Sequence, residues 1–326
     1  MRRRDVLAAG LAGLFSCAFA PAWAQQFPAR PIHVVVPSSP GGIHDVIARI
    51  WAQRVSADLG TSIIENRGGG AALIAITAVA NSPPDGYSLL LGSTSTIVMR
   101  VLEDRVKYAA AEALEPATIF SASSTSIVVS PKLPVNTVQE LIAYARARPG
   151  KLTFGSGGAG AITHVAGELF LQRAGLEMVH VPYKGIAPAL NDFLGGRIDV
   201  MFPNITSRIL LAHANRELRI LAINAPARID AAPHIATAIE AGLAHFVAQL
   251  TFGLYAPAKT PARVLERIAS ATQAGWADKE FQKKMFEAGF EPVLGAGPAK
   301  SKQMIAKEYA RWKPAIDAVR TQEGGR

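Results

Sequence analysis

The stretch HVVVPSSPGGIHDVIARIWAQRV, residues 33–55, contains a run of valines, a turn rich in proline and glycine, and an amphipathic helix. The β-branched run predicts a buried strand over Ile32–Val36. Apolar side chains recur at helical spacing through Asp45–Leu59, which predicts a helix there. The loop between them, Pro37–Asp45, either only turns a corner or holds a ligand against its backbone N–H groups. This stretch alone leaves both interpretations open.

The first 24 residues have the composition of an export signal. A basic start, Arg2–Arg4, precedes an apolar run from Val6 to Ala20, and Ala22–Ala24 supplies the small residues that a signal peptidase requires. We expect cleavage after Ala24 and a periplasmic protein; an ordinary N-terminal helix is the alternative. No later run of about eighteen apolar residues appears, so no membrane span is expected.

Cysteine and charge exclude several kinds of chemistry. The only cysteine is Cys17, which leaves with the export signal, so we exclude thiolate catalysis, disulfides and cysteine-bound metal. Cleavage also removes three arginines and Asp5, a net +2, so the formal net charge of +9 becomes +7. No run of five basic residues occurs and aromatic residues make up only 7% of the chain, so we expect no nucleic-acid partner. The scattered positive charge would instead attract small anions.

Strand and helix patterns alternate along the 326-residue chain, which predicts an α/β protein with mainly parallel sheets. The pattern begins again after Ser124. In each half, one strand runs into a glycine- and serine-rich loop and then a helix: Pro37–Asp45 in the first half and Gly155–His164 in the second. Ligands of open α/β sheets bind at the carboxyl ends of strands. The two loops therefore indicate a cleft between two lobes.

Both loops have the design of an anion site. Their glycines let the backbone approach a ligand, and the N–H groups at the start of the following helix attract a carboxylate or phosphate. We expect Asp45 to cap its helix or brace the loop. The hydroxyl-rich segment Leu91–Thr96 ends another strand and is a further candidate for hydrogen bonds to a polar ligand.

The sequence gives little support for a catalytic or cofactor-binding motif. The segment GSGGAG formally fits a dinucleotide fingerprint, but no acidic residue ends the next strand to hold a ribose. A hydrolase nucleophile requires glycine two residues before the serine, and Phe154 stands there before Ser156. His164 and Glu168 lie four residues apart on one helix face, but no second pair of metal ligands is nearby. We therefore expect no catalytic residue, cofactor or metal.

The segments PSSPGGIHD, ENRGGGAALIA, PGKLTFGSGGAGAITHVAGELF and VHVPYKGIAPALNDFLGGRIDVMF follow one another in this order. Together they resemble the landmarks of the tripartite tricarboxylate transporter receptor family, the TctC-like or Bug periplasmic solute-binding proteins. The resemblance implies a two-domain, type II periplasmic-binding-protein-like fold, in which each domain is a sheet flanked by helices. It also implies a small carboxylate ligand in the interdomain cleft, gripped by backbone N–H groups and hydroxyls, and TctA- and TctB-like membrane subunits as partners.

We expect domain I to comprise residues 25–124 and 252–326 and domain II to comprise residues 125–251. The hinge is expected near Ser124–Ser126 and Leu250–Phe252. The candidate ligand-binding residues are Ser38, Ser39, Gly41, Gly42, His44, Asp45, Ser93, Thr94, Ser95, Ser156, Gly157, Gly158, Ala159, Thr163, His164 and Pro203.

Some of these positions depart from the pattern of the family that the chain resembles. Members often carry an aromatic residue at Ser38, a proline at Ser39, a threonine at His44 and an acidic residue at Pro203. The missing acid at Pro203 argues against a ligand with an amino group, and His44 could donate to a second carboxylate. The identity of the ligand stays open.

We expect a monomeric, exported solute-binding protein that captures a small carboxylate for a tripartite tricarboxylate-type transporter and catalyses no reaction. Two alternatives remain from the sequence. One is a periplasmic α/β hydrolase acting on a small ester or phosphate. The other is a sensory receptor that reports its ligand to a membrane signalling protein.

Overall fold

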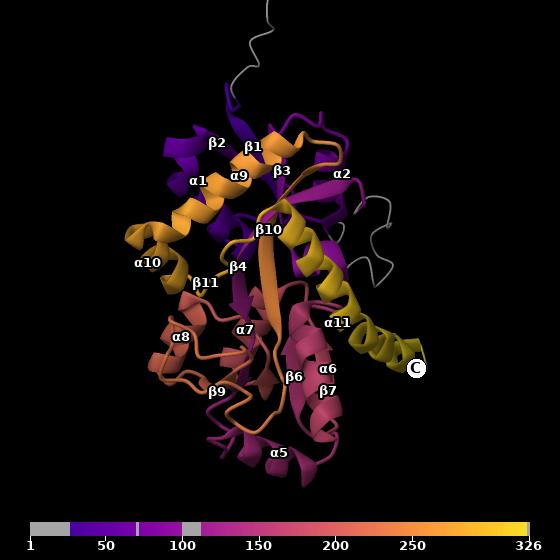
Figure 1. Cartoon of the computed structure of the whole chain (residues 1–326). Helices are drawn as coiled ribbons and strands as arrows, with labels where there is room; N and C mark the ends of the chain where they lie inside the picture. Colours follow the sequence, from indigo (N-terminus) through magenta and orange to yellow (C-terminus); the bar gives the residue numbers. More distant parts are fainter. Residues whose placement is uncertain (1–26, 70–71, 100–111, 325–326) are drawn as a thin grey trace, which may run out of the picture.

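The computed structural model describes residues 27–69, 72–99 and 112–324; the predicted export signal, residues 1–24, lies outside this part. Figure 1 shows two lobes, one above the other, and each contains one sheet. The upper sheet has the strand order β11-β4-β10-β3-β1-β2. Its strands are β1 (Ile32–Val36), β2 (Ser62–Asn66), β3 (Ser88–Ser93), β4 (Leu114–Ser124), β10 (Gln249–Pro257) and β11 (Glu291–Pro292).

The lower sheet has the order β7-β6-β8-β5-β9. Its strands are β5 (Ser126–Val129), β6 (Thr153–Ser156), β7 (Val179–Pro182), β8 (Val200–Met201) and β9 (Arg219–Ile223). Helices cover both sheets (Figure 1). They are α1 (Ile43–Leu59), α2 (Leu73–Ala80), η2 (Ser95–Met99), α5 (Val138–Arg146), α6 (Ile162–Ala174), α7 (Ile186–Leu194), α8 (Ser207–Ala214), α9 (Ala262–Ala274), η3 (Gly275–Ala277), α10 (Lys279–Glu287) and α11 (Pro298–Gly324).

The predicted α/β class, with two sheets flanked by helices, is confirmed. The prediction of mainly parallel sheets is wrong. Parallel pairing occurs where a helix connects neighbouring strands, as between β1 and β2 or β6 and β7. However, β10 runs antiparallel to both β3 and β4, and β5 runs antiparallel to both β8 and β9. The strands that pass between the lobes therefore run antiparallel to their neighbours within each sheet.

The two sheets are tied together at Thr125, which lies between β4 and β5 and is fully buried. Its N–H donates to the carbonyl oxygen of Ala248 at 2.8 Å, and its carbonyl accepts the N–H of Asn224 at 2.8 Å. Its hydroxyl donates to the same Ala248 oxygen at 2.9 Å and accepts from Asn224 Nδ2 at 2.8 Å. The outward chain through β4 and β5 and the returning chain before β10 are thus hydrogen-bonded at the crossing.

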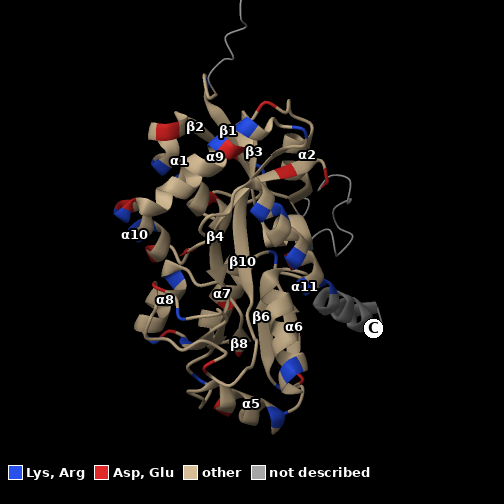
Figure 2. Cartoon of the chain, viewed as in Figure 1, with Lys and Arg blue, Asp and Glu red and all other residues tan. Residues whose placement is uncertain are grey.

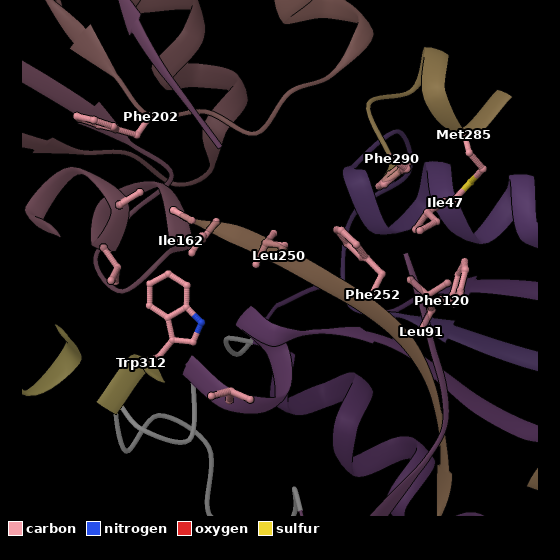
Figure 3. Packing of buried hydrophobic residues seen from close by; sticks show 14 of the residues in the cluster. Ile47, Leu91, Phe120, Ile162, Phe202, Leu250, Phe252, Met285, Phe290 and Trp312 are labelled. Atoms are coloured by element: carbon pink, nitrogen blue, oxygen red, sulfur yellow. The ribbon is translucent and has the colours of Figure 1, made fainter. Parts of the chain in front are cut away.

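One buried hydrophobic cluster extends through both lobes (Figure 3). In the upper lobe it includes Ile47 on α1, and in the lower lobe Ile162, the first residue of α6. Leu250 and Phe252 on β10 lie between these two helices in Figure 3. The core therefore includes residues of α1, α6 and β10.

The charged residues are distributed over both lobes. In Figure 2, Lys and Arg are scattered among Asp and Glu rather than gathered on one face of this view. This agrees with the scattered pattern in the sequence. Within the described residues, no helix is long and apolar enough to cross a membrane.

The packing of α1 on α9 includes a buried hydrogen bond that can be tested. Trp51 is fully buried, and its indole N–H donates to Thr272 Oγ1 at 2.9 Å. Thr272→Val removes the acceptor without removing volume, so the free energy of unfolding should fall by about 1–3 kcal/mol in urea denaturation. Thr77→Val, at an exposed site on α2, is the control and should change it by less than about 0.5 kcal/mol. Equal effects of the two substitutions would contradict this role for Thr272.

Candidate functional site

The two predicted loops follow the carboxyl ends of β1 and β6, each of which is paired in parallel with its neighbours on both sides. Each loop leads directly into a helix, α1 or α6, as the sequence predicted. The N-cap residues of these helices are Gly42 and Ala161, and neither provides a side-chain hydrogen bond to the helix. In contrast, Thr137, Thr206 and Asp278 cap α5, α8 and α10 with their side chains. The N-cap side chains therefore leave first-turn N–H groups of α1 and α6 unsatisfied, as at α2, α7 and α9, although the N–H of His164 donates to the carbonyl oxygen of Ala161 at 2.9 Å.

Asp45 braces the first loop, as predicted. Its carboxylate accepts the N–H of Gly41 at 2.9 Å and the side-chain amide of Asn66 at 3.0 Å, and it forms an ion pair with Arg49 at 2.9 Å. Burial opposes the charged form, but the hydrogen bonds from Arg49, Gly41 and Asn66 outweigh it and hold the pKa of Asp45 below its ordinary value. The carboxylate therefore stabilises the loop, and Arg49 balances its negative charge.

Ser38 presents the one orphaned hydroxyl of the first loop. Its Oγ is buried, and among the described residues it has no hydrogen-bond partner. The atom lies against the start of α1, because a Cβ placed on Gly42 would be 3.0 Å from it. An unpaired buried hydroxyl costs about 1–3 kcal/mol. A polar group bound at this helix start would satisfy it. Ser39, the next residue, is exposed.

His44 on α1 links the first loop to the end of β3. Its Nε2 lies 2.9 Å from Ser93 Oγ, and its ring meets the edge of Phe252 with 5.3 Å between centroids. Burial lowers the pKa of His44 to about 4, so the ring is neutral at pH 7. Next to it, Thr94 bonds to Thr251 of β10, with 2.6 Å between the two hydroxyl oxygens.

The segment after Thr94 differs from the prediction of a polar loop. A π-helical turn, η2, begins at Ser95 and continues to Met99. Its residues Ile97 and Val98 are buried, and this burial favours an ordered helical turn. The hydroxyls of Ser93, Thr94 and Ser95 therefore mark the point where β3 passes into a packed turn.

The second loop is cross-linked by its own side chains. Thr163 Oγ1 accepts the N–H of Gly157 at 2.9 Å, and Ser156 Oγ accepts the N–H of Gly158 at 3.1 Å. His164 Nδ1 accepts the N–H of Gly160 at 3.1 Å. Gly158 has a φ of +117°, and a Cβ there would lie 2.9 Å from the carbonyl oxygen of Tyr183, so this position requires glycine. The loop is thus rigid before any ligand arrives.

The first residues of β10 contact α1 and the end of β3. Phe252 contacts His44 of α1, and Thr251 bonds to Thr94. Leu250 belongs to the same buried cluster as Ile162, and Figure 3 shows it on the side of β10 toward that residue. Two residues of a strand span only about 7 Å. β10 thus contacts the start of α1 through Phe252 and the end of β3 through Thr251, while Leu250 shares a buried cluster with Ile162. Ala159, in the second loop, is half-buried.

Pro203 lies outside both loops. It is buried after β8, where its carbonyl oxygen accepts the N–H of Ser126 at 2.8 Å and the Ser126 hydroxyl at 3.0 Å. Its described contacts are therefore with the strand crossing. Only the resemblance to the receptor family makes Pro203 a candidate ligand-binding residue.

His180 was missed by the sequence analysis, which treated it only as part of a strand. The parallel register of β6 and β7 pairs His180 with Phe154 and brings it beside Ser156. Its Nε2 lies 2.7 Å from Ser156 Oγ, and its ring stacks on that of His164 with 4.0 Å between centroids. Only the pairing of these two strands could have shown this.

His164, Glu168 and His180 form a group whose potential ligand atoms all lie within 4.8 Å of one another. Two histidines and one carboxylate are a known donor set for metals. However, the N–H of Gly160 points at Nδ1 of His164, so the neutral ring keeps its proton on Nε2, the atom 3.5 Å from Glu168. A metal bound at Nε2 would require that proton on Nδ1, against the Gly160 N–H. The hydrogen bonds do not favour a metal here.

Ser156 and His180 do not form a hydrolytic pair with the usual support. Ser156 is fully buried, and its oxygen accepts the Gly158 N–H. Glu168 faces His164, and among the described residues no hydrogen bond to a carboxylate orients His180. A nucleophilic serine needs a base that a third group holds in place.

The chain is thus a two-lobed α/β protein in which a loop and a helix follow a parallel-paired strand of each sheet. Residues 47–320 match the tripartite tricarboxylate transporter family receptor, TctC. BugT of Bordetella pertussis is 34% identical over 91% of each chain. A solved periplasmic transporter is 32% identical, with a TM-score of 0.80, over 91% of this chain and 98% of its own. Rpa4515 of R. palustris, solved with adipate, is 31% identical, with a TM-score of 0.79, over 90% of this chain and 98% of its own.

The chain therefore belongs to the tripartite tricarboxylate transporter receptor family, whose structures include periplasmic binding proteins. The family resemblance seen in the sequence is confirmed. The match covers all of α6 and covers α1 from Ile47 onward, so the first four residues of α1, Ile43–Val46, lie before it.

The half-buried His44 makes stability depend on pH. Folding lowers its pKa from 6.5 to about 4, so the unfolded chain binds the proton more readily, and this stability is lost as the pH falls from 6.5 toward 4. The melting temperature of the ligand-free protein should therefore fall more between pH 7 and 4.5 than that of His44→Gln, by roughly 2–5 °C. If the melting temperatures of the two proteins fall equally with pH in thermal denaturation, His44 does not contribute to the pH dependence of stability.

Proposed function

We propose that this protein is an exported receptor that captures a small dicarboxylate between the starts of α1 and α6 and presents it to a membrane transporter. Each helix start would receive one carboxylate through its first-turn N–H groups, with hydroxyls from the loops alongside. The proposal assigns ligand contacts to the candidate residues around these starts. It leaves Asp45 as the brace of the first loop.

The orphaned hydroxyl of Ser38 carries this proposal. A buried Oγ without a partner, at the uncapped start of α1, is suited to donate to an anion. The second helix start, at Ile162, is also uncapped, and its loop is already rigid. Two uncapped helix starts, one in each lobe, suit a ligand with an anionic group at each end. The adipate bound to Rpa4515 is a ligand of that chemical class.

The chemistry of the site supports binding without turnover. The serine of the second loop is buried and serves as an acceptor for Gly158, and the neutral His44 is bonded to Ser93. The ligand would therefore be held and released unchanged. This favours the receptor over the hydrolase considered from the sequence.

The two lobes would act as domains that close on the ligand. We propose domain I as residues 25–124 and 252–326 and domain II as residues 125–251, with hinges near Ser124–Ser126 and Leu250–Phe252. The single-residue link at Thr125 between β4 and β5 supports this division. Closure would bury the ligand, and TctA- and TctB-like subunits would recognise the closed form. Cleavage after Ala24 and a monomeric state belong to the same proposal.

Calorimetry with a series of linear dicarboxylates from malonate to suberate tests the proposed ligand class. At least one member should bind, and the monocarboxylate of equal length should bind at least tenfold more weakly, because one helix start loses its charged partner. No binding by any member of the series, or equal binding of the matched monocarboxylate, would refute the proposal.

Ser38→Ala tests the site itself. It removes the orphaned hydroxyl, so the ligand-free protein should keep or gain stability, while the Kd of the best dicarboxylate should rise about 10- to 100-fold. Ser62→Ala is a matched control, because Ser62 Oγ is also buried without a described partner but begins β2, at the opposite end of the sheet. It should leave the Kd unchanged. A Kd unaffected by Ser38→Ala would remove Ser38 from the site.

A further inference from the structure

A turn of the upper lobe, residues 287–291, rests on the lower lobe away from the crossing strands. We call this turn the clasp; it connects α10 to β11, and Figure 1 shows both above α8. Ser207, the first residue of α8, donates its hydroxyl to the carbonyl oxygen of Glu287. Beside this bond the lobes are separated by an open groove, which Leu211 of α8 and Phe286 of α10 line. The clasp is therefore one of the contacts that join the lobes besides the crossing strands.

The backbones of the two lobes meet at Gly289. Its φ of +83° lies in the left-handed region, and its N–H donates to the carbonyl oxygen of Phe286 at 2.9 Å, which ends α10. A Cβ on Gly289 would collide with the carbonyl group of Ile205 and would lie 3.2 Å from Cα of Thr206. Both of these residues precede α8 in the lower lobe. The position thus requires glycine for its own conformation and for the close approach of the lobes.

Glu291, at the end of the clasp, carries a carboxyl group close to the lower lobe. Its backbone is held in the upper sheet, where it pairs with Ala122 of β4 and accepts the Ser121 hydroxyl at 3.0 Å. Among the described residues, its buried Oε1 has no hydrogen-bond partner. Burial and the negative charge of Asp230 raise the pKa of Glu291 to about 7, although the N–H groups of Asp230 and Ala231 oppose this rise. Near neutral pH this carboxyl is therefore present in both protonation states.

The other charged groups around the clasp are paired elsewhere. On α10, Glu287 lies 3.9 Å from Lys283, and on α8 the guanidinium of Arg208 is hydrogen-bonded within the lower lobe. The residues of β4 that pair with β11 carry no charge. The charge that acts on Glu291 from the lower lobe is that of Asp230, which has the same sign. Ionised Glu291 is thus both partly desolvated and repelled by the lobe that it contacts.

We propose that the clasp is a proton-dependent contact between the lobes: protonated Glu291 keeps the turn docked on the lower lobe, and ionised Glu291 is repelled by Asp230 and loosens it. The proton is exchanged with solvent water. The docked state binds this proton more tightly than free carboxyl does, so docking is favoured below the ordinary pKa of 4.5 and weakens as the pH rises through about 7. The inference goes beyond the ligand site and uses the proposed function only for the movement of the lobes.

Spin labels on the two lobes test the clasp without any ligand. Cys17 is the only cysteine and is expected to leave with the export signal, so Ser56→Cys on α1 and Ala143→Cys on α5, both exposed, can be labelled alone. Distances from electron spin resonance should be narrowly distributed at pH 5.5. At pH 8.5 the distribution should broaden or shift by about 2 Å or more. Glu291→Gln cannot ionise and should keep the narrow distribution at both pH values.

Three further variants separate the charge from the contact. Asp230→Asn removes the repulsion, so the pH response should become smaller and move to lower pH. Gly289→Ala forces the backbones apart and should broaden the distances at every pH. Glu280→Gln, which changes an exposed carboxyl at the other end of α10, is the control and should respond to pH as the wild type does.

Two results would overturn the inference. One is the same pH response in the wild type and Glu291→Gln, and the other is a folded Gly289→Ala protein with wild-type distances. Adipate and its homologues separate this inference from the proposed function. If no dicarboxylate binds but the distances still follow Glu291, the proposed function fails while the clasp stands. If a dicarboxylate binds and the distances ignore Glu291, the clasp fails while the receptor stands.

Discussion

The hydrogen bonds of Thr125 set the relation between the two lobes. Its backbone and hydroxyl bond to Ala248 and Asn224, which belong to the returning chain. These bonds align β4 with β10, and β10 then carries Thr251 and Phe252 against the first loop. Leu250 of β10 belongs to the same buried cluster as Ile162, the first residue of α6, so the crossing strand takes part in the packing of both lobes. The site thus depends on strand pairing first and on loop chemistry second.

The described contacts of the two loops involve few full charges. Asp45 would repel an anion at the start of α1, but Arg49 and Asn66 satisfy its carboxylate, and Arg49 is in turn occupied by it. The neighbouring His44 is neutral because burial lowers its pKa to about 4. What remains is the partial positive charge of N–H groups and hydroxyls. The proposed site would attract an anion without the strong desolvation cost of a buried cation, which would suit a receptor that must also release its ligand.

The sequence predicted the loops and their helices well, because glycine runs between a β-branched strand and an amphipathic helix are local signals. It missed β4 entirely. That strand contains Ser121, Ser123 and Ser124, and serine lacks the β-branched or aromatic side chain typical of strands. All three are nevertheless buried, and the first two donate to carbonyl oxygens of distant segments. The antiparallel crossings and the stacking of His180 on His164 were not predicted for the same reason, since both arise from pairing between segments remote in sequence.

The two loops differ in how they are prepared for a ligand. In the second loop, Gly157, Gly158 and Gly160 already donate to side chains, so its shape is fixed and its contribution to binding comes from the start of α6 behind it. In the first loop, Gly41 is bonded to Asp45 while the hydroxyl of Ser38 is left unpaired. The second loop therefore loses its conformational entropy during folding rather than on binding, which lowers the free-energy cost of binding. The unpaired hydroxyl of the first loop instead gains its hydrogen bond only when an anion arrives, and this gain is what would favour the liganded state over the empty one.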